Sequence, residues 1–190
     1  MPRSRNLPVY HRLAALLGLF LLVLSPVPAG AEIWLRVDTA ALRLDVMDGD
    51  QVVHSYSGIA IGRYGATAAK RAGDGMTPLG GFRIVRSTSS TDFRRFYALD
   101  YPDLSHARAG LAAGRISTEE FERIRRALRR GLGPPQHTAL GGHIGIHGLG
   151  KGDPEIHADF NWTEGCVALT NEQIDDLAQW AGIGTRVIIE

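Results

Sequence analysis

The chain has 190 residues, a formal net charge of +1 and 44% hydrophobic residues, with a single cysteine. This length and composition predict one globular domain large enough for a real core. The near-neutral charge argues against a nucleic-acid-binding protein, which needs a strongly basic surface, and the single cysteine excludes an internal disulfide.

The first 31 residues are expected to form a secretory signal peptide. A start rich in arginine precedes the apolar run Leu13–Leu24, which is followed by two prolines and then by Ala29-Gly30-Ala31. This order is typical of a leader that is cleaved after the last small residue, Ala31. The run is shorter than the roughly 20 apolar residues that cross a bilayer, but a retained membrane anchor stays open as the alternative. Cleavage would leave a single domain, residues 32–190, with a net charge of −2.

Alternating patterns predict β-strands over the first half of this domain. Apolar and other residues alternate over 33–37 and 42–46, and Asp48-Gly49-Asp50 is a hairpin signal. Further strands are expected at 52–61, 81–85 and 96–101, and the polar, glycine-rich segment 62–78 is expected to be a loop.

The second half combines two helices with short strands. Ser117–Arg130 has an apolar stripe, a serine that can cap its start, and Glu120 at the position of a capping box. It belongs to an arginine-rich insert, residues 105–141, which is a candidate lid. Its arginines are interpreted as a solvated face, with contact to an anionic polymer as the alternative. Strands at 143–147 and 186–189, with a helix capped by Thr170 or Asn171, complete a mainly β fold with flanking helices.

Cys166 is the strongest candidate for chemistry, within Thr163-Glu164-Gly165-Cys166. A thiol is a good nucleophile only as the thiolate, so it needs a positive or dipolar partner. Gly165 allows a tight turn and the close approach of a substrate carbonyl, and the amides near Cys166 would then form an oxyanion hole. The Thr163 hydroxyl is expected to fix this turn. The alternative is that Cys166 is a small, inert residue of the core.

The expected partner of Cys166 is His147, at the end of the strand 143–147. A neutral imidazole within hydrogen-bond reach accepts the thiol proton, and a carbonyl at or near Gly148 would orient its other ring nitrogen. In a regular strand, His143 would lie on the same face as His147, whereas His157 is expected at the surface. The further candidates to line the site are His143, Glu164 and Trp162.

Three segments, in the correct order, resemble a known enzyme family. They are Gly73-Asp74-Gly75-Met76-Thr77-Pro78-Leu79-Gly80 with Phe82, then Ile146-His147-Gly148, then Thr163-Glu164-Gly165-Cys166-Val167-Ala168-Leu169-Thr170-Asn171. Together they are similar to the catalytic domain of L,D-transpeptidases, the YkuD-type domain. Tyr101-Pro102, Gly141-Gly142 and Trp162-Thr163 resemble its YafK-like branch.

The resemblance implies a β-sandwich-like fold with flanking helices and the stem peptides of peptidoglycan as substrate. It also implies that Cys166 attacks the carbonyl at the L-centre of the third stem residue and expels the terminal D-amino acid. His147 would act as base and then as acid, and the Gly165 and Cys166 amides would hold the oxyanion. The acyl-enzyme would pass to an amine or to water, without metal or cofactor.

With the signal peptide, the resemblance implies a periplasmic protein. An outer-membrane lipoprotein is a further candidate partner. Neither nucleic-acid binding nor stable membrane insertion after cleavage is expected.

Two departures from the family pattern keep alternatives open. Glu164 stands where many members have His, and Ala168 where many have an Arg that is a candidate contact for the substrate carboxylate. Transfer to an amine and hydrolysis, including release of wall-bound lipoprotein, both stay open, as does a non-catalytic wall-binding module. A zinc peptidase is a further alternative. Its ligands would be His143, His147, His157 and Cys166.

Overall fold

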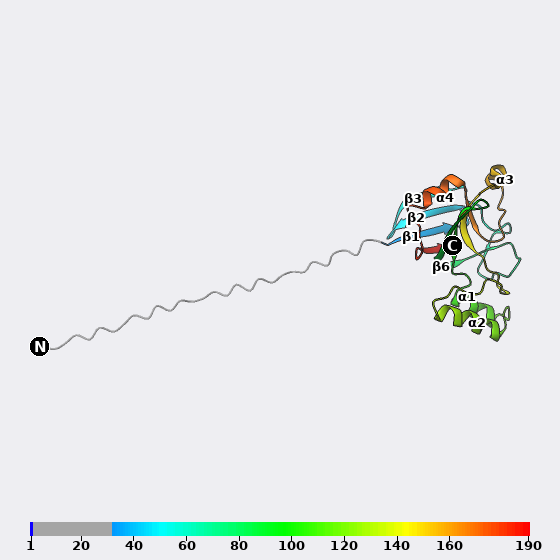
Figure 1. Cartoon of the computed structure of the whole chain (residues 1–190), viewed down its shortest axis with the longest axis horizontal. Coiled ribbons are helices and arrows are strands. Elements are labelled where there is room, and N and C mark those ends of the chain that lie inside the picture. Colours follow the sequence, from blue (N-terminus) through cyan, green and yellow to red (C-terminus); the bar gives the residue numbers. More distant parts are fainter. Residues whose placement is uncertain (2–31) are drawn as a thin grey trace. The chain divides into compact units, whose positions relative to one another are not determined.

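The computed structural model describes residue 1 and residues 32–190 (Figure 1). The predicted signal peptide, and the choice between its cleavage and its retention as an anchor, therefore lie outside the described residues. Among the residues that are described, no helix has the length and apolar character needed to cross a bilayer.

Eight strands form one mixed sheet in the order β3-β2-β1-β10-β6-β7-β8-β9. Its parallel pairs are β1 with β10 and β8 with β9. The strands are β1 (Ile33–Asp38), β2 (Arg43–Asp48), β3 (Gln51–Ser57), β6 (Gly80–Ser90), β7 (Arg94–Leu99), β8 (Gly145–Gly148), β9 (Val167–Leu169) and β10 (Arg186–Ile189). The expected mainly β fold with flanking helices is confirmed.

The long strand β6 joins the two halves of the sheet. Its first residues pair with β10 and its later residues pair with β7, with a register shift between Ile84 and Arg86. The core lies on the inner face, where Leu35 and Val37 alternate with less buried neighbours and Phe82 is also buried. This alternation is what a strand with one face on a core requires, and it explains why the sequence pattern located these strands.

The chain after β3 crosses to the opposite edge of the sheet. The strand expected at 52–61 ends at Ser57, because Gly58 has a φ of 69° and turns the backbone. Ala60 then exchanges two hydrogen bonds with Ala168 beside β9, at 2.9 and 2.7 Å. The segment around Ala60 therefore supports the turn that carries the cysteine.

The expected loop 62–78 contains two short strands, β4 (Ala66–Thr67) and β5 (Thr77–Pro78), which pair in parallel. The Gly62 N–H donates to the Thr77 Oγ1 at 2.8 Å, and the Thr77 N–H donates to the Gly65 oxygen. These hydrogen bonds join the start of the loop, which follows β3, to its end at Thr77.

Four helices flank the sheet: α1 (Leu104–Ala112), α2 (Thr118–Arg129), α3 (Pro154–Asp159) and α4 (Asn171–Leu177). In Figure 1, α1 and α2 lie together at one end and α4 lies at the other, where it packs on β7 and β8. The sequence predicted α2 and α4 but not α1 or α3. The capping box at α2 is only half formed, because the Glu120 carboxylate accepts the Ala139 N–H instead.

Candidate functional site

A cleft of about 450 Å³ opens at the ends of β8 and β9. It contains both predicted catalytic side chains, Cys166 and His147, and its lining residues include none from the insert 105–141. A larger hollow of about 620 Å³ is lined by neither cysteine nor histidine. The cleft is lined by Arg86, Thr88, Phe93, Phe96, His143, His147, Trp162, Thr163, Glu164 and Cys166.

The parallel pairing of β8 with β9 explains why these two side chains share a cleft. His147 lies opposite Ala168 in the register. Cys166 directly precedes β9, two residues before Ala168, and lines the same cleft as His147. Residues 19 positions apart in the sequence are therefore neighbours across the sheet.

His147 is almost fully buried, with 2% of its surface exposed. Its Nδ1 lies 2.8 Å from the Gly148 carbonyl oxygen, which can only accept, so Nδ1 carries the proton and Nε2 is the acceptor. The rings of Phe93, Phe96 and Trp162 surround the imidazole, with centroids 4.7, 5.9 and 5.8 Å away. Burial lowers the pKa of His147, and the Gly148 carbonyl opposes this only in part. The imidazole is therefore neutral at pH 7 and able to accept a proton.

The Cys166 thiol is partly exposed to the cleft and donates to the His143 backbone oxygen, with Sγ 3.4 Å from it. Burial raises the pKa of the Cys166 thiol to about 11, and the Gly145 N–H and the Lys70 charge oppose this rise. At neutral pH the thiol is protonated, so a base must remove its proton before it can attack.

The turn before Cys166 is fixed by Thr163. The Thr163 hydroxyl donates to the Cys166 carbonyl oxygen at 2.7 Å and accepts the Gly165 N–H at 3.1 Å. The Gly165 N–H, which was expected to face a substrate oxygen, has the Thr163 hydroxyl as its acceptor in this structure. Gly165 itself has a φ of 135°, a conformation that residues with a Cβ rarely adopt.

The three further candidates all line the cleft, although not all for the expected reason. His143 has a φ of 56° and precedes β8, so the argument from a regular strand was wrong, yet its side chain still reaches the cleft. Glu164 is exposed and forms an ion pair with Arg63. The Trp162 Nε1 donates to the His157 Nδ1 at 3.3 Å.

His157 is buried rather than at the surface, with 5% of its area exposed, which corrects the sequence expectation. It lies on α3, behind Trp162, and its burial follows from this contact. Over residues 32–190, no three His, Cys, Asp or Glu side chains gather closely enough to hold a metal ion. The zinc alternative therefore lacks a ligand set among these residues.

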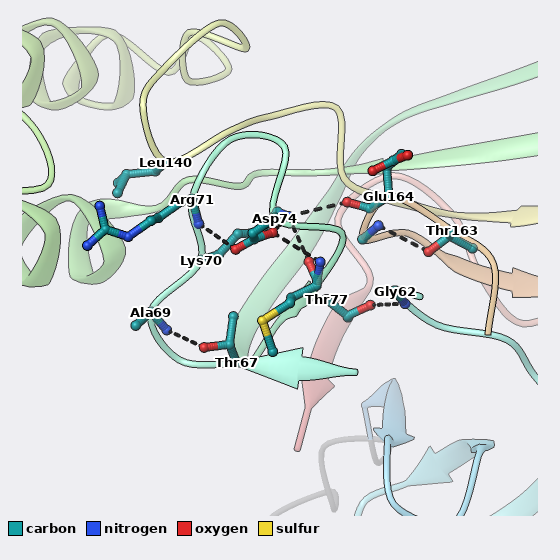
Figure 2. A network of polar contacts seen from close by, with 12 residues as sticks. Gly62, Thr67, Ala69, Lys70, Arg71, Asp74, Thr77, Leu140, Thr163 and Glu164 are labelled. Atoms are coloured by element: carbon teal, nitrogen blue, oxygen red, sulfur yellow. Dashed lines mark hydrogen bonds and ion pairs between the residues drawn. The ribbon is translucent and has the colours of Figure 1, made fainter. Parts of the chain in front are cut away.

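Sequence reasoning missed two charged residues at the site. Arg86, on β6, is the one Lys or Arg among the residues that line the cleft. Lys70, from the glycine-rich loop, lies behind the cysteine turn, with its Nζ 3.3 Å from the Glu164 backbone oxygen (Figure 2). One signal for Lys70 was available, because the sequence has only two lysines, Lys70 and Lys151, among 21 Lys and Arg residues.

A family model described as YkuD, L,D-transpeptidase catalytic domain, matches residues 32–189. The chain belongs to the L,D-transpeptidase catalytic domain family. The match covers the whole folded region described above, and the cleft with Cys166 and His147 lies within it. No protein of curated function matches the chain in sequence.

Solved structures with a similar fold include two from bacteria. Bd1075 of Bdellovibrio bacteriovorus is 19% identical with a TM-score of 0.57, over 87% of this chain and 50% of that one. The helical cell shape determining protein Pgp2 of Campylobacter jejuni is 21% identical with a TM-score of 0.57, over 85% of this chain and 48% of that one. At these identities the likeness shows the fold alone, and this L,D-transpeptidase domain spans about half the length of those chains.

Proposed function

We propose that this domain is a cysteine L,D-transpeptidase that acts on the stem peptides of peptidoglycan through a thioester intermediate. One observation carries the proposal: the cleft holds the Cys166 thiol and a buried imidazole, His147, whose Nδ1 lies 2.8 Å from the Gly148 carbonyl oxygen. That arrangement suits a general base beside a nucleophile. Because peptidoglycan lies outside the cytoplasm, we also propose export through residues 1–31 and a periplasmic location.

In the first half-reaction, Cys166 loses its proton to the His147 Nε2 as Sγ bonds to the carbonyl carbon of the third stem residue. The tetrahedral intermediate collapses, and the bond to the terminal D-amino acid breaks. The leaving amine takes the proton from His147, which returns to the neutral form. The product is a thioester on Cys166.

In the second half-reaction, an acceptor attacks the thioester. His147 removes a proton from the acceptor amine or water, and the same proton then returns to the departing Cys166 sulfur. An amine acceptor gives a cross-link or an attached lipoprotein, and water gives a shortened stem peptide or released lipoprotein. We favour transfer as the activity of the family and keep hydrolysis as an outcome of the test.

Two groups are proposed to hold the substrate. The Cys166 N–H is the remaining candidate donor to the oxyanion, because the Gly165 N–H is bound to Thr163. Arg86 is proposed to bind the carboxylate of the terminal D-amino acid. Ala168 cannot serve this purpose and has no room for a larger side chain, because it is fully buried and paired with Ala60.

The experiment that tests the proposal is incubation of purified tetrapeptide muropeptides with the native protein and with Cys166→Ala. Products are identified by mass. Dimers indicate transfer, tripeptides alone indicate hydrolysis, and no change with the native protein contradicts both. EDTA should leave the activity unchanged if the thiol does the chemistry, and loss of activity would favour the zinc alternative.

A second measurement separates the enzyme from a non-catalytic wall-binding module. Incubation with a carbapenem should add one drug molecule to the native protein, and none to Cys166→Ala, as read by intact mass. A folded native protein that stays unmodified would support the wall-binding module.

A further inference from the structure

Lys70 is a buried charge that the reaction above does not use. Its side chain is 3% exposed, although it belongs to a loop, and it lies between Asp74 and the backbone of Glu164 (Figure 2). A charge removed from water is costly unless it is paired and hydrogen-bonded. A lysine in such a place needs a structural or chemical reason.

The surroundings of Lys70 satisfy an ammonium group completely. Its Nζ donates to the Asp74 Oδ1 at 2.7 Å, to the Met76 carbonyl at 2.7 Å and to the Glu164 carbonyl at 3.3 Å. Three acceptors thus meet the three N–H donors of the ammonium. The planar guanidinium of arginine would not match this arrangement, which explains a lysine in a chain that has only one other lysine, Lys151.

These bonds connect the glycine-rich loop to the turn that carries the nucleophile. A Cβ on Gly165 would lie 2.6 Å from the Met76 oxygen and 3.0 Å from the Lys70 Nζ. The backbone of the turn therefore rests directly on the lysine and on the carbonyl that the lysine holds. Any displacement of Lys70 would move the residue adjacent to Cys166.

The ammonium also acts on the thiol through its charge. Burial raises the pKa of Cys166, and the Lys70 charge opposes that effect. Because Lys70 is buried, salt in the solvent screens this interaction less than it would screen a surface pair. The Lys70 side chain therefore both contacts the turn before Cys166 and places a positive charge near the thiol.

We propose that Lys70 is a positioning residue for the reaction: it fixes the Gly165–Cys166 turn through Met76 and Glu164 and supplies the permanent positive charge beside the nucleophile. This inference rests on the proposed function, in which Cys166 attacks the substrate.

The test is the pH dependence of Cys166 alkylation by iodoacetamide, followed by intact mass in the folded protein. Because the chain has one cysteine, each adduct reports this thiol alone. Lys70→Met removes the charge at similar volume, and we expect alkylation to be about tenfold slower at pH 8, with its midpoint moved to higher pH. Lys70→Arg keeps the charge but not the fit, so its rate should lie between those of Lys70→Met and the native protein.

Thr77→Val is the matched control. It removes the hydroxyl that accepts the Gly62 N–H and should lower stability without moving the alkylation midpoint. A folded Lys70→Met protein with the native alkylation profile would overturn the inference. Muropeptide turnover by the native protein is scored separately. If the native protein turns over muropeptides and Lys70→Met keeps the native alkylation profile, only this inference is rejected. If Lys70→Met has an altered alkylation profile and the native protein turns over no muropeptide, only the proposed function is rejected.

If the Lys70 variants do not fold, the native protein still provides a test. Labelling with ¹⁵N-lysine gives only two Nζ signals, from Lys70 and from the exposed Lys151. We expect the Lys70 signal to exchange slowly with solvent and to shift when Cys166 is alkylated or deprotonated. A rapidly exchanging Lys70 signal, or one unchanged by modification of Cys166, would contradict the proposal.

Discussion

The two sides of the cleft hold their functional groups by opposite means. His147 is surrounded by aromatic rings and makes one hydrogen bond to Gly148. The Cys166 turn instead rests on the ion pair of the buried Lys70 with the partly exposed Asp74. Apolar burial keeps a base neutral, whereas a fixed positive charge favours the anion that a nucleophile must become. We therefore expect substitutions around His147 and substitutions around the Cys166 turn to have different effects.

The largest effect is expected on the base side. His147→Ala should slow carbapenem acylation of Cys166 by about 10³-fold, because it removes the proposed base for the thiol proton. The rate is measured by intact mass over time. His143→Ala is the matched control, since its side chain lines the same cleft but it interacts with Cys166 through its backbone oxygen. Equal losses in the two variants would contradict the assignment of the base.

The next effect concerns stability and contrasts the two sides directly. Asp74→Asn should lower the free energy of unfolding by about 3 kcal/mol, because it leaves the Lys70 charge buried without its counter-charge. Phe96→Leu, which thins the aromatic surroundings of His147, should cost about 1 kcal/mol. Urea unfolding measures both. If Phe96→Leu lowers the free energy of unfolding more than Asp74→Asn does, the cysteine turn does not depend on the ion pair.

A smaller effect is expected on substrate binding. Arg86→Gln should raise KM about tenfold for a tetrapeptide with a free terminal carboxylate, with little change in kcat. A substrate with a terminal carboxamide should bind both proteins equally poorly. Arg63→Gln, which removes the partner of exposed Glu164, serves as the control with little expected change. Unequal binding of the carboxamide would show that Arg86 acts on another part of the substrate.

The smallest effect is on pH dependence. Burial lowers the pKa of His147 in the folded protein, so its neutral form adds stability that is present above pH 6.5 and is lost as the pH falls through the folded pKa. The rate of Cys166 acylation should depend on the same imidazole, and it should stay constant as the pH is lowered until a limit below pH 6.5. Phe93→Ala, which admits water to the ring, should move this limit upward by less than one pH unit. A native limit above pH 6.5 would contradict the neutral base.

Much of the fold was predictable because the strands have one buried face. The alternation in β1 reflects burial of every second residue from Leu35 to Val37, whereas β2 is buried at four consecutive positions, and β10 begins and ends at the expected residues. Helices α1 and α3 escaped prediction. Helix α1 is rich in alanine and has no strong apolar stripe, and α3 has only six residues.

The residues of the site that lie in short sequence motifs were predictable. Cys166 and His147 come from two such motifs, and the parallel register of β8 with β9 brings them to one cleft. Lys70 and Arg86 could not be found in this way, because their roles depend on contacts between segments far apart in the sequence. His157 was placed wrongly for a different reason: its burial depends on packing against the nearby Trp162, which the sequence pattern does not reveal.

The raised pKa of Cys166 has a consequence for oxidative damage. Peroxides react with the thiolate, and over-oxidation of a nucleophilic cysteine to its sulfinic acid is generally irreversible. A resting enzyme whose sulfur stays protonated is therefore spared this loss, and the sulfur becomes vulnerable only during turnover. The chain has no second cysteine that could rescue the proposed nucleophile by forming a disulfide, so protection of the resting thiol matters more than it would in a protein with two.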